Sequence, residues 1–280
     1  MSINFKHSKV ESAPIKISND KSNILLDMPI ENIDKNELPD VTIITITRNR
    51  KAFFPLAIDN WNRIYYPHDK LTWLVVDDSD DIEQGPVRQL KSLQDNRISY
   101  YYLPPPNNSK GHNIGYKRNF AMGLTKTEYI VMMDDDDYLY NESVLARVCL
   151  MKFYNKECVY SDQLGIYDIK NESSYVAEKF LDVPEGSLAL TKTFWEQQKF
   201  GENENISEGM NLVNGRELKM LKIPYYFNLI VINHKNNTSQ RSKNIRFKKD
   251  KNKLSKSTPI NFFHFFPDTF KQELSKLKSE

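Results

Sequence analysis

Cysteine and long hydrophobic runs are both scarce in this sequence, and each shortage excludes a class of protein. The 280 residues include two cysteines, Cys149 and Cys158, which cannot form a disulfide framework and have no metal-ligand spacing around them. The longest apolar runs, such as residues 71–76, are far too short to span a bilayer, and residues 1–18 lack the apolar stretch of a secretion signal. The sequence therefore predicts a soluble, cytoplasmic protein with reduced thiols and no transmembrane segment.

A strong excess of either charge is also missing. The 39 basic and 37 acidic residues leave a net charge of +2, so no overall field favours nucleic acid as a partner. Hydrophobic residues make up 39% of the chain and include 15 Tyr, 15 Phe and 3 Trp. This composition excludes a disordered chain and predicts one sizeable core.

Apolar segments alternate with amphipathic ones between residues 41 and 133. The expected strands are 41–46, 71–76, 98–103 and 129–133, and the expected helices between them are 54–64, 86–93 and 115–124. This alternation predicts an α/β fold, a mostly parallel sheet flanked by helices. Three of the strands end in charged or Arg/Asn-rich loops (TRNR, DDSDD and DDDD), and ligands bind beyond the carboxyl ends of strands in such sheets.

The rest of the chain is less regular. The expected elements there are helices at 142–154, 191–200 and 206–220, a strand and turn at 159–169, a strand at 225–232 and a terminal amphipathic helix opened by Asp268. Residues 1–39 are polar, and residues 235–256 carry nine basic side chains against the single acid Asp250. We therefore divide the chain into an N-terminal extension (1–39), a central domain (40–240) and a basic C-terminal segment with a terminal helix (241–280).

Four consecutive aspartates, Asp134 to Asp137, follow the expected strand 129–133 directly. Neighbouring carboxylates repel one another, and at the rim of a core this repulsion is costly unless a cation offsets it. Carboxylate oxygens favour Mg²⁺ or Mn²⁺. In an extended segment residues i and i+2 point the same way, so Asp134 and Asp136 can share one metal site. The alternative is a solvated acidic turn that precedes the next helix.

Four motifs, in order, resemble those of GT-A glycosyltransferases of the family 2 type. They are TRNR at 47–50, VVDDSD at 75–80, GYKRNFAM at 115–122 and YIVMMDDDD at 129–137. That family usually has TYNR, VDDGS, ARN-x-A and FLD-x-DD at these places. The resemblance is close over about residues 41–138 and looser through 241. It implies a GT-A (Rossmann-like) fold whose nucleotide-sugar half is 41–138 and whose acceptor half is 139–240.

The resemblance assigns individual residues to a UDP-linked sugar donor. These residues are Thr47, Arg48, Asp78, Arg118 and Asp135. Thr47 and Arg48 are implied to touch the base and ribose, and Asp78 to accept a hydrogen bond from uracil N3. Arg118 is implied to face the base and the diphosphate. Arg48 departs from the family, which commonly has an aromatic there, but a guanidinium can also stack on a base.

The resemblance also implies a metal site. Asp134 and Asp136 would form the D-x-D element, in which a divalent Mn²⁺ or Mg²⁺ bridges the two phosphates. His234, in the stretch INHKNNTSQR, resembles the late histidine that completes the metal or diphosphate site. Arg241, at the end of that stretch, suits phosphate oxygens.

Glu208 is our candidate for the general base, which an inverting transfer needs to deprotonate the acceptor hydroxyl. It begins an expected helix, where the family usually carries an E-D pair, but Gly209 stands where the Asp is often found. Glu202 and Glu204 are rival candidates. Trp195 resembles a residue of the acceptor side, although an aromatic at helical spacing is more often part of the core.

The leading hypothesis is therefore a metal-dependent hexosyltransferase that moves sugar from a UDP-linked donor to a glycan or protein hydroxyl with inversion. A sugar nucleotidyltransferase is disfavoured because the loop TRNRKAF contains no glycine to cradle phosphates. A catalytically silent carbohydrate- or nucleotide-binding protein on the same fold is the alternative from another class. The Lys- and Asn-rich composition is typical of an AT-rich genome, such as that of a large DNA virus or an AT-rich microbe.

Overall fold

The computed structural model describes residues 35–106, 111–177, 183–237, 255–257 and 261–278. Residues 40–280 form one compact unit. Residues 1–39 form a separate unit, of which only Lys35 to Pro39 are described, with a 3-10 helix at Lys35–Glu37. In the described part of the chain, no helix combines the length and the apolar character that crossing a membrane requires.

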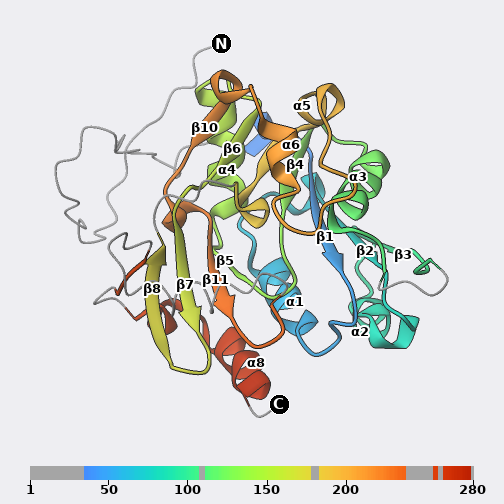
Figure 1. Cartoon of the computed structure of the whole chain (residues 1–280), viewed down its shortest axis with the longest axis vertical. Helices are drawn as coiled ribbons and strands as arrows, with labels where there is room; N and C mark the ends of the chain where they lie inside the picture. Colours follow the sequence, from blue (N-terminus) through green and yellow to red (C-terminus); the bar gives the residue numbers. More distant parts are fainter. Residues whose placement is uncertain (1–34, 107–110, 178–182, 238–254, 258–260, 279–280) are drawn as a thin grey trace. The chain divides into compact units, whose positions relative to one another are not determined.

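The larger of two sheets has seven strands in the order β10-β6-β9-β4-β1-β2-β3 (Figure 1). Its strands are β1 (Val41–Thr47), β2 (Leu71–Asp77), β3 (Ile98–Tyr102), β4 (Tyr129–Met132), β6 (Cys158–Tyr160), β9 (Ala189–Thr191) and β10 (Met220–Lys222). The strands β4, β1, β2 and β3 are parallel to one another, whereas β9 runs antiparallel to both β4 and β6. The four strands expected from the sequence are confirmed, and so is the mostly parallel α/β sheet.

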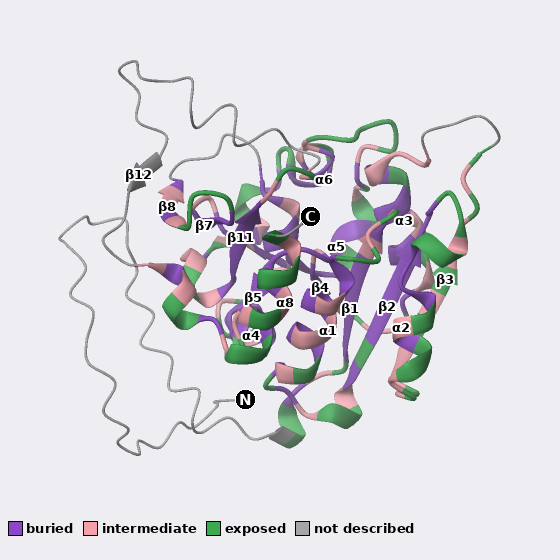
Figure 2. Cartoon of the chain, turned by 90° about the horizontal axis from the view of Figure 1, so that it is seen from below, coloured by how far each residue is buried: buried purple, intermediate pink, exposed green. Residues whose placement is uncertain are grey.

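Helices cover both faces of this sheet. The connecting helices are α1 (Phe54–Arg63), α2 (Val87–Ser92), α3 (Ile114–Leu124), α4 (Ser143–Phe153) and α5 (Lys192–Gln197). On one face, α1 stacks Phe54 and Trp61 on Trp73 of β2, with ring centroids 5.6 and 5.4 Å apart. On the other face, the alternate side chains of β2 join α3 in one core cluster, which includes Leu74, Val76, Ala121 and Met122. This alternation makes β1 and β2 buried on both sides (Figure 2).

A second sheet has the order β12-β8-β7-β11-β5, and Figure 1 shows β8, β7 and β11 side by side. Its strands are β5 (Tyr138–Leu139), β7 (Leu164–Asp168), β8 (Ser173–Ala177), β11 (Leu229–Asn233) and β12 (Ser255–Ser257). The terminal helix α8 (Asp268–Lys278) packs its apolar side against this sheet and α1. Because β5 begins directly after the four aspartates, this sheet fixes one end of the acidic loop.

Short 3-10 helices join several of these elements. They are η3 (His68–Lys70), η4 (Ile82–Gln84), η5 (Glu185–Ser187), η6 (Glu217–Lys219), η7 (Tyr225–Phe227) and η8 (Phe262–Phe265). The turn η5 leads directly into β9 of the larger sheet.

Three sequence-based expectations in the second half are wrong in detail. The expected helix 206–220 is only α6 (Gly209–Val213), because Gly215 adopts a φ of 73° and ends it before η6 and β10 begin. The segment 159–169 contributes to two strands, β6 and β7, that belong to different sheets. The expected strand 225–232 starts as η7 after Pro224, and extended structure begins only at Leu229.

Two other expectations hold. Trp195 is a buried core residue, and its indole N–H donates to Asn119 at 2.9 Å. Cys149 and Cys158 are free thiols, and burial raises the pKa of Cys149 to about 11.

We predict that Phe270→Ala lowers the free energy of unfolding by about 3–5 kcal/mol, the usual cost of deleting a buried aromatic ring. Phe270 is fully buried between Tyr138 and Phe266, with ring centroids 5.1 and 5.2 Å away. Urea denaturation measures the loss. Phe265→Ala is the matched control, because that ring is 51% exposed. Equal losses in the two variants would contradict the packing of α8.

Candidate active site

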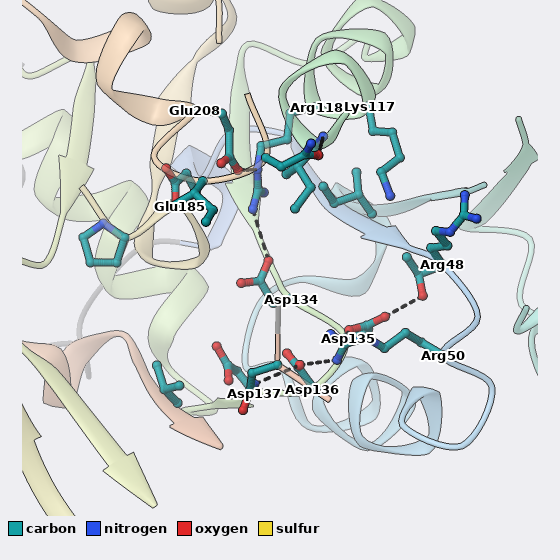
Figure 3. Close-up of a pocket in the computed structure, with 18 of the residues that line it drawn as sticks. Arg48, Arg50, Lys117, Arg118, Asp134, Asp135, Asp136, Asp137, Glu185 and Glu208 are labelled. Atoms are coloured by element: carbon teal, nitrogen blue, oxygen red, sulfur yellow. Dashed lines mark hydrogen bonds and ion pairs between the residues drawn. The ribbon is translucent and has the colours of Figure 1, made fainter. Parts of the chain in front are cut away.

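The site forms where the strand order of the larger sheet reverses. From β1 the chain proceeds outward to β2 and β3, then returns to β4 on the other side of β1. The carboxyl ends of β1 and β4 therefore diverge into different loops, and ligands bind at such switch points. A cavity of about 620 Å³ opens there, large enough for a small-molecule ligand. Figure 3 shows the charged side chains that line it.

The four consecutive aspartates after β4 each have a different partner. Asp135, Asp136 and Asp137 are all at least 92% buried, so their mutual repulsion has to be offset locally. The partners include guanidinium groups, a hydroxyl and a backbone N–H. They come from different elements and hold the carboxylates in different directions. The contacts are Arg118 to Asp134, Thr47 to Asp135, Arg50 and His234 to Asp136, and the Ile232 N–H to Asp137.

Asp136 is held in its ionised form by two partners. Its Oδ2 accepts from Arg50 and lies 2.9 Å from His234 Nε2. Burial by itself would raise the pKa of this carboxyl, but Arg50 and His234 reverse that effect and hold it well below its usual range. The His234 ring is itself fixed by stacking on Phe53, with centroids 4.3 Å apart.

Asp135 has the opposite character. Its carboxyl accepts from the Thr47 hydroxyl at the end of β1, and Arg50 lies 3.7 Å away. Burial raises the pKa of Asp135 to about 7, although the charge of Arg50 opposes the shift. One loop thus presents two neighbouring carboxyls with very different pKa values.

A second cluster lies at the end of β2. Asp78 is fully buried, and its Oδ1 accepts from Lys117 Nζ at 2.7 Å. Its Oδ2 accepts from the His112 backbone N–H at 2.7 Å and lies 3.6 Å from Arg48. Arg48 pairs on its other side with the exposed Asp80. The carboxylate of Asp78 therefore holds two cations in place at the cavity wall.

The opposite wall carries a pair of acidic side chains around Arg118. Glu208, at the start of α6, accepts from Arg118 Nε at 2.8 Å, and both side chains are buried. Glu185 of η5 lies beside them (Figure 3). Burial would lower the pKa of Arg118, but Glu208, Asp134 and Glu185 together raise it.

The structure brings most of the predicted residues to this cavity. The predicted residues that line it are Thr47, Arg48, Arg118, Asp134, Asp135, Asp136 and Glu208. Asp78 lies behind Lys117 and Arg48, and His234 contacts Asp136. Arg241 and the basic stretch around it fall outside the described residues. The rivals Glu202 and Glu204 are exposed and are not among the lining residues.

Sequence reasoning missed three charged residues of the site. Arg50 and Lys117 both stand inside the motifs TRNR and GYKRNFAM, close to the predicted site residues Arg48 and Arg118. Each of them contacts a second motif only in the folded chain: Arg50 reaches the loop after β4, and Lys117 reaches the end of β2. Glu185 lies in the segment VPEGS, which carries no motif.

Comparison with solved structures shows where the fold recurs. The mannosyltransferase PcManGT from Pyrobaculum calidifontis, in complex with GDP-Man and Mn²⁺, shares 17% identity over 88% of this chain and 70% of its own, with a TM-score of 0.53. S. aureus TarS 1–349 shares 12% identity over 69% of this chain and 60% of its own, with a TM-score of 0.51. The same protein in complex with UDP-GlcNAc gives a TM-score of 0.50.

These similarities concern the fold alone, and this chain covers only part of each of these proteins. This chain spans 60% of the length of TarS 1–349 and 37% of the longer TarS chain. No curated protein matches the sequence. The family described as Glycosyl transferase family 2 matches residues 42–211, which is more than half of the chain. With its mostly parallel sheet and the cavity at the β1–β4 switch point, this protein belongs to glycosyl transferase family 2 and has the GT-A fold.

Proposed function

We propose that the protein transfers a hexosyl group from a UDP-linked sugar to a glycan or protein hydroxyl, with inversion at the anomeric carbon and with a divalent metal. One observation carries this proposal: a single cavity has a cation-rich wall at β2 and α3, an acidic loop after β4 and a carboxylate pair opposite. Those three features suit a base and ribose, a diphosphate and an acceptor hydroxyl, respectively.

The wall around Asp78 is the proposed place of the nucleotide base. Asp78 keeps acceptor capacity beside its bonds to Lys117 and His112, because a carboxylate has about four lone-pair positions. Asp78 lies behind Lys117 and Arg48, so a uracil N3–H uses that capacity when Arg48 moves aside to stack on the base. Arg48, held by Asp78 and Asp80, offers a flat guanidinium for stacking. TarS has been solved with UDP and UDP-GlcNAc, which supports a uridine nucleotide, whereas PcManGT was solved with GDP-Man.

We predict that the wild-type protein binds UDP more tightly than GDP in calorimetry with Mn²⁺ present. Asp78→Asn should weaken UDP binding by about 10–100-fold, the worth of one hydrogen bond to a charged group. GDP binding serves as the control and should change less, so the preference for UDP should shrink. An unaltered UDP-to-GDP ratio in the variant would remove Asp78 from base recognition.

The residues of the acidic loop fit a divalent cation in their chemistry. Asp134 and Asp136 are hard oxygen donors on one cavity wall, Asp136 is held ionised, and His234 lies against it. Among the described residues, no three His, Cys, Asp or Glu side chains are gathered as a ready metal site, since Asp136 faces Arg50 and Asp134 faces Arg118. We propose that Asp134, Asp136 and His234 bind the ion and that Asp135, next to them, contacts the nucleotide-sugar donor. When bound, such an ion neutralises charge on the departing diphosphate.

We predict that Asp136→Asn lowers Mn²⁺-dependent UDP affinity by more than about tenfold, since even outer-shell changes at metal sites typically cost 10–100-fold. The variant keeps the size of the side chain but loses its charge. Asp69→Asn, in the exposed η3 at the far end of β2, is the matched control and should bind normally. The measurement is calorimetry of UDP with Mn²⁺ and with EDTA. Wild-type affinity in Asp136→Asn would exclude this residue as a metal ligand.

The wall formed by Glu208 and Glu185 is the proposed place of the acceptor hydroxyl. Inversion needs a carboxylate that takes the hydroxyl proton as the oxygen attacks. Glu208, the residue predicted from the sequence, lines the cavity here with Glu185 next to it. The Arg118 guanidinium between Asp134 and Glu208 faces the space between donor and acceptor and can stabilise the departing diphosphate.

The function itself is tested with a panel of UDP- and GDP-sugars, Mn²⁺ and hydroxyl acceptors. Release of nucleoside diphosphate that increases with acceptor supports transfer, and proton NMR of the product reports the anomeric configuration. Retained configuration would exclude the inverting part of the proposal. Tight UDP binding without turnover from any donor would favour a catalytically silent nucleotide-binding protein instead.

A further inference from the structure

The carboxylate of Glu185 occupies the space that a side chain at position 209 would fill. Its Oε1 accepts from the Gly209 backbone N–H at 3.0 Å. A Cβ placed on Gly209 would lie 3.0 Å from Glu185 Cγ and 3.1 Å from Oε1, which is closer than nine in ten real contacts of a Cβ atom. Glycine at 209 therefore makes room for a carboxylate that arrives from another part of the chain, at the first residue of α6.

The turn that carries Glu185 is held firmly from three sides. The Asn228 side-chain amide donates to the Ser187 carbonyl at 2.7 Å, and the Ser161 backbone N–H donates to Ser187 Oγ at 3.1 Å. The fully buried Arg147 donates to the Leu188 carbonyl at 3.2 Å and to the Met132 carbonyl at 3.3 Å. Arg147 thereby ties this turn to the end of β4, just before the acidic loop. A group on such a scaffold is preorganised.

The two carboxylates of this wall differ in what they already contact. Glu208 is 3% exposed, and its Oε1 is the acceptor of the Arg118 Nε–H. Glu185 is only partly buried and lines the cavity, and no ion pair joins it to a side chain in the described segments. Glu208 is therefore placed to orient Arg118, whereas Glu185 is placed to meet a hydroxyl.

The electrostatic surroundings of Glu185 suit a proton acceptor. The charged groups that face it are Glu208 on α6 and Arg118 on α3, and Arg118 is shared with Asp134 after β4. Burial, followed by the negative charge of Glu208, raises the pKa of Glu185 to about 7, with Arg118 opposing. A base whose pKa lies near the working pH combines a usable ionised fraction with real affinity for the proton.

We propose that Glu185 is the catalytic base of the transfer and that Glu208 is a positioning residue that acts through Arg118; this rests on the proposed function. The acceptor oxygen forms a bond to the anomeric carbon as the bond from that carbon to the phosphate oxygen breaks. The electron pair of the broken bond leaves with the nucleoside diphosphate. The hydroxyl proton passes to the Glu185 carboxylate, which later releases it to water.

The decisive comparison is between Glu185→Gln and Glu208→Gln, with Glu204→Gln as the matched control because Glu204 is exposed and is not a lining residue. In wild type, the transfer rate should rise through about pH 7 and then level off, because Glu185 works as a base only when ionised. Glu185→Gln should lower transfer at pH 8 by about 10²–10⁴-fold and remove this rise. Glu208→Gln should lose less and keep the rise, moved to lower pH, because the charge that repels the Glu185 carboxylate is gone.

A variant that carries the carboxylate at a neighbouring position tests catalysis directly, because it would not restore transfer if Glu185 had only a structural role. Glu185→Ala empties the space beside Gly209, so the double variant Glu185→Ala/Gly209→Asp can place an acid in nearly the same position. Its transfer rate should exceed that of Glu185→Ala by at least about tenfold. Thermal unfolding and UDP calorimetry of every variant check the fold and the donor site, and neither should worsen in Glu185→Gln.

The outcomes separate this inference from the proposed function. If wild type transfers sugar and Glu185→Gln does so equally well, Glu185 is not the base while the transferase assignment stands. If Glu208→Gln is the variant that abolishes the pH-dependent rise, the base is Glu208 and the inference is overturned. If wild type shows no turnover with any donor, the proposed function fails, and the role of Glu185 fails with it.

Discussion

Much of this active site depends on how one loop accommodates four adjacent negative charges. Repulsion among Asp134 to Asp137 would oppose burial of the loop, yet three of the four residues are buried. The protein resolves this by surrounding the carboxylates with donors and cations from several elements. Because those partners come from β1, α3, β11 and the loops after β1 and β11, the acidic loop ties both sheets to the helix that carries Arg118.

Arg118 extends the same compensation across the cavity. Its guanidinium lies between Asp134 on the acidic loop and Glu208 at the start of α6, with Glu185 nearby. The charge state of one wall is thus coupled to that of the other. A ligand that brings negative charge close to Asp134 would attract Arg118 and lessen its hold on Glu208, so the two walls are not electrically independent.

The sequence could predict what depends on local pattern, and it could not predict what depends on tertiary contact. The strands β1, β2 and β4 were predictable because buried parallel strands are continuous apolar runs. Thr47, Arg118 and Asp136 were found because they stand in motifs that resemble those of the family. Glu185 was missed because its role comes from the missing side chain of Gly209, some twenty residues later. The helix expected at 206–220 failed because apolar periodicity continued past Gly215, where the backbone turns.

The hydrogen bond from Ile232 to Asp137 has a consequence for how the site comes into being. It joins residues that are distant in sequence, and so do the pairing of β5 with β11 and the contact of His234 with Asp136. During synthesis the acidic loop leaves the ribosome long before β11 does, and until then its charges lack two of their partners. Long-range contacts of this kind form late and slow the folding of a chain. Competence to hold a ligand is therefore a late event, reached only when nearly the whole domain has been made.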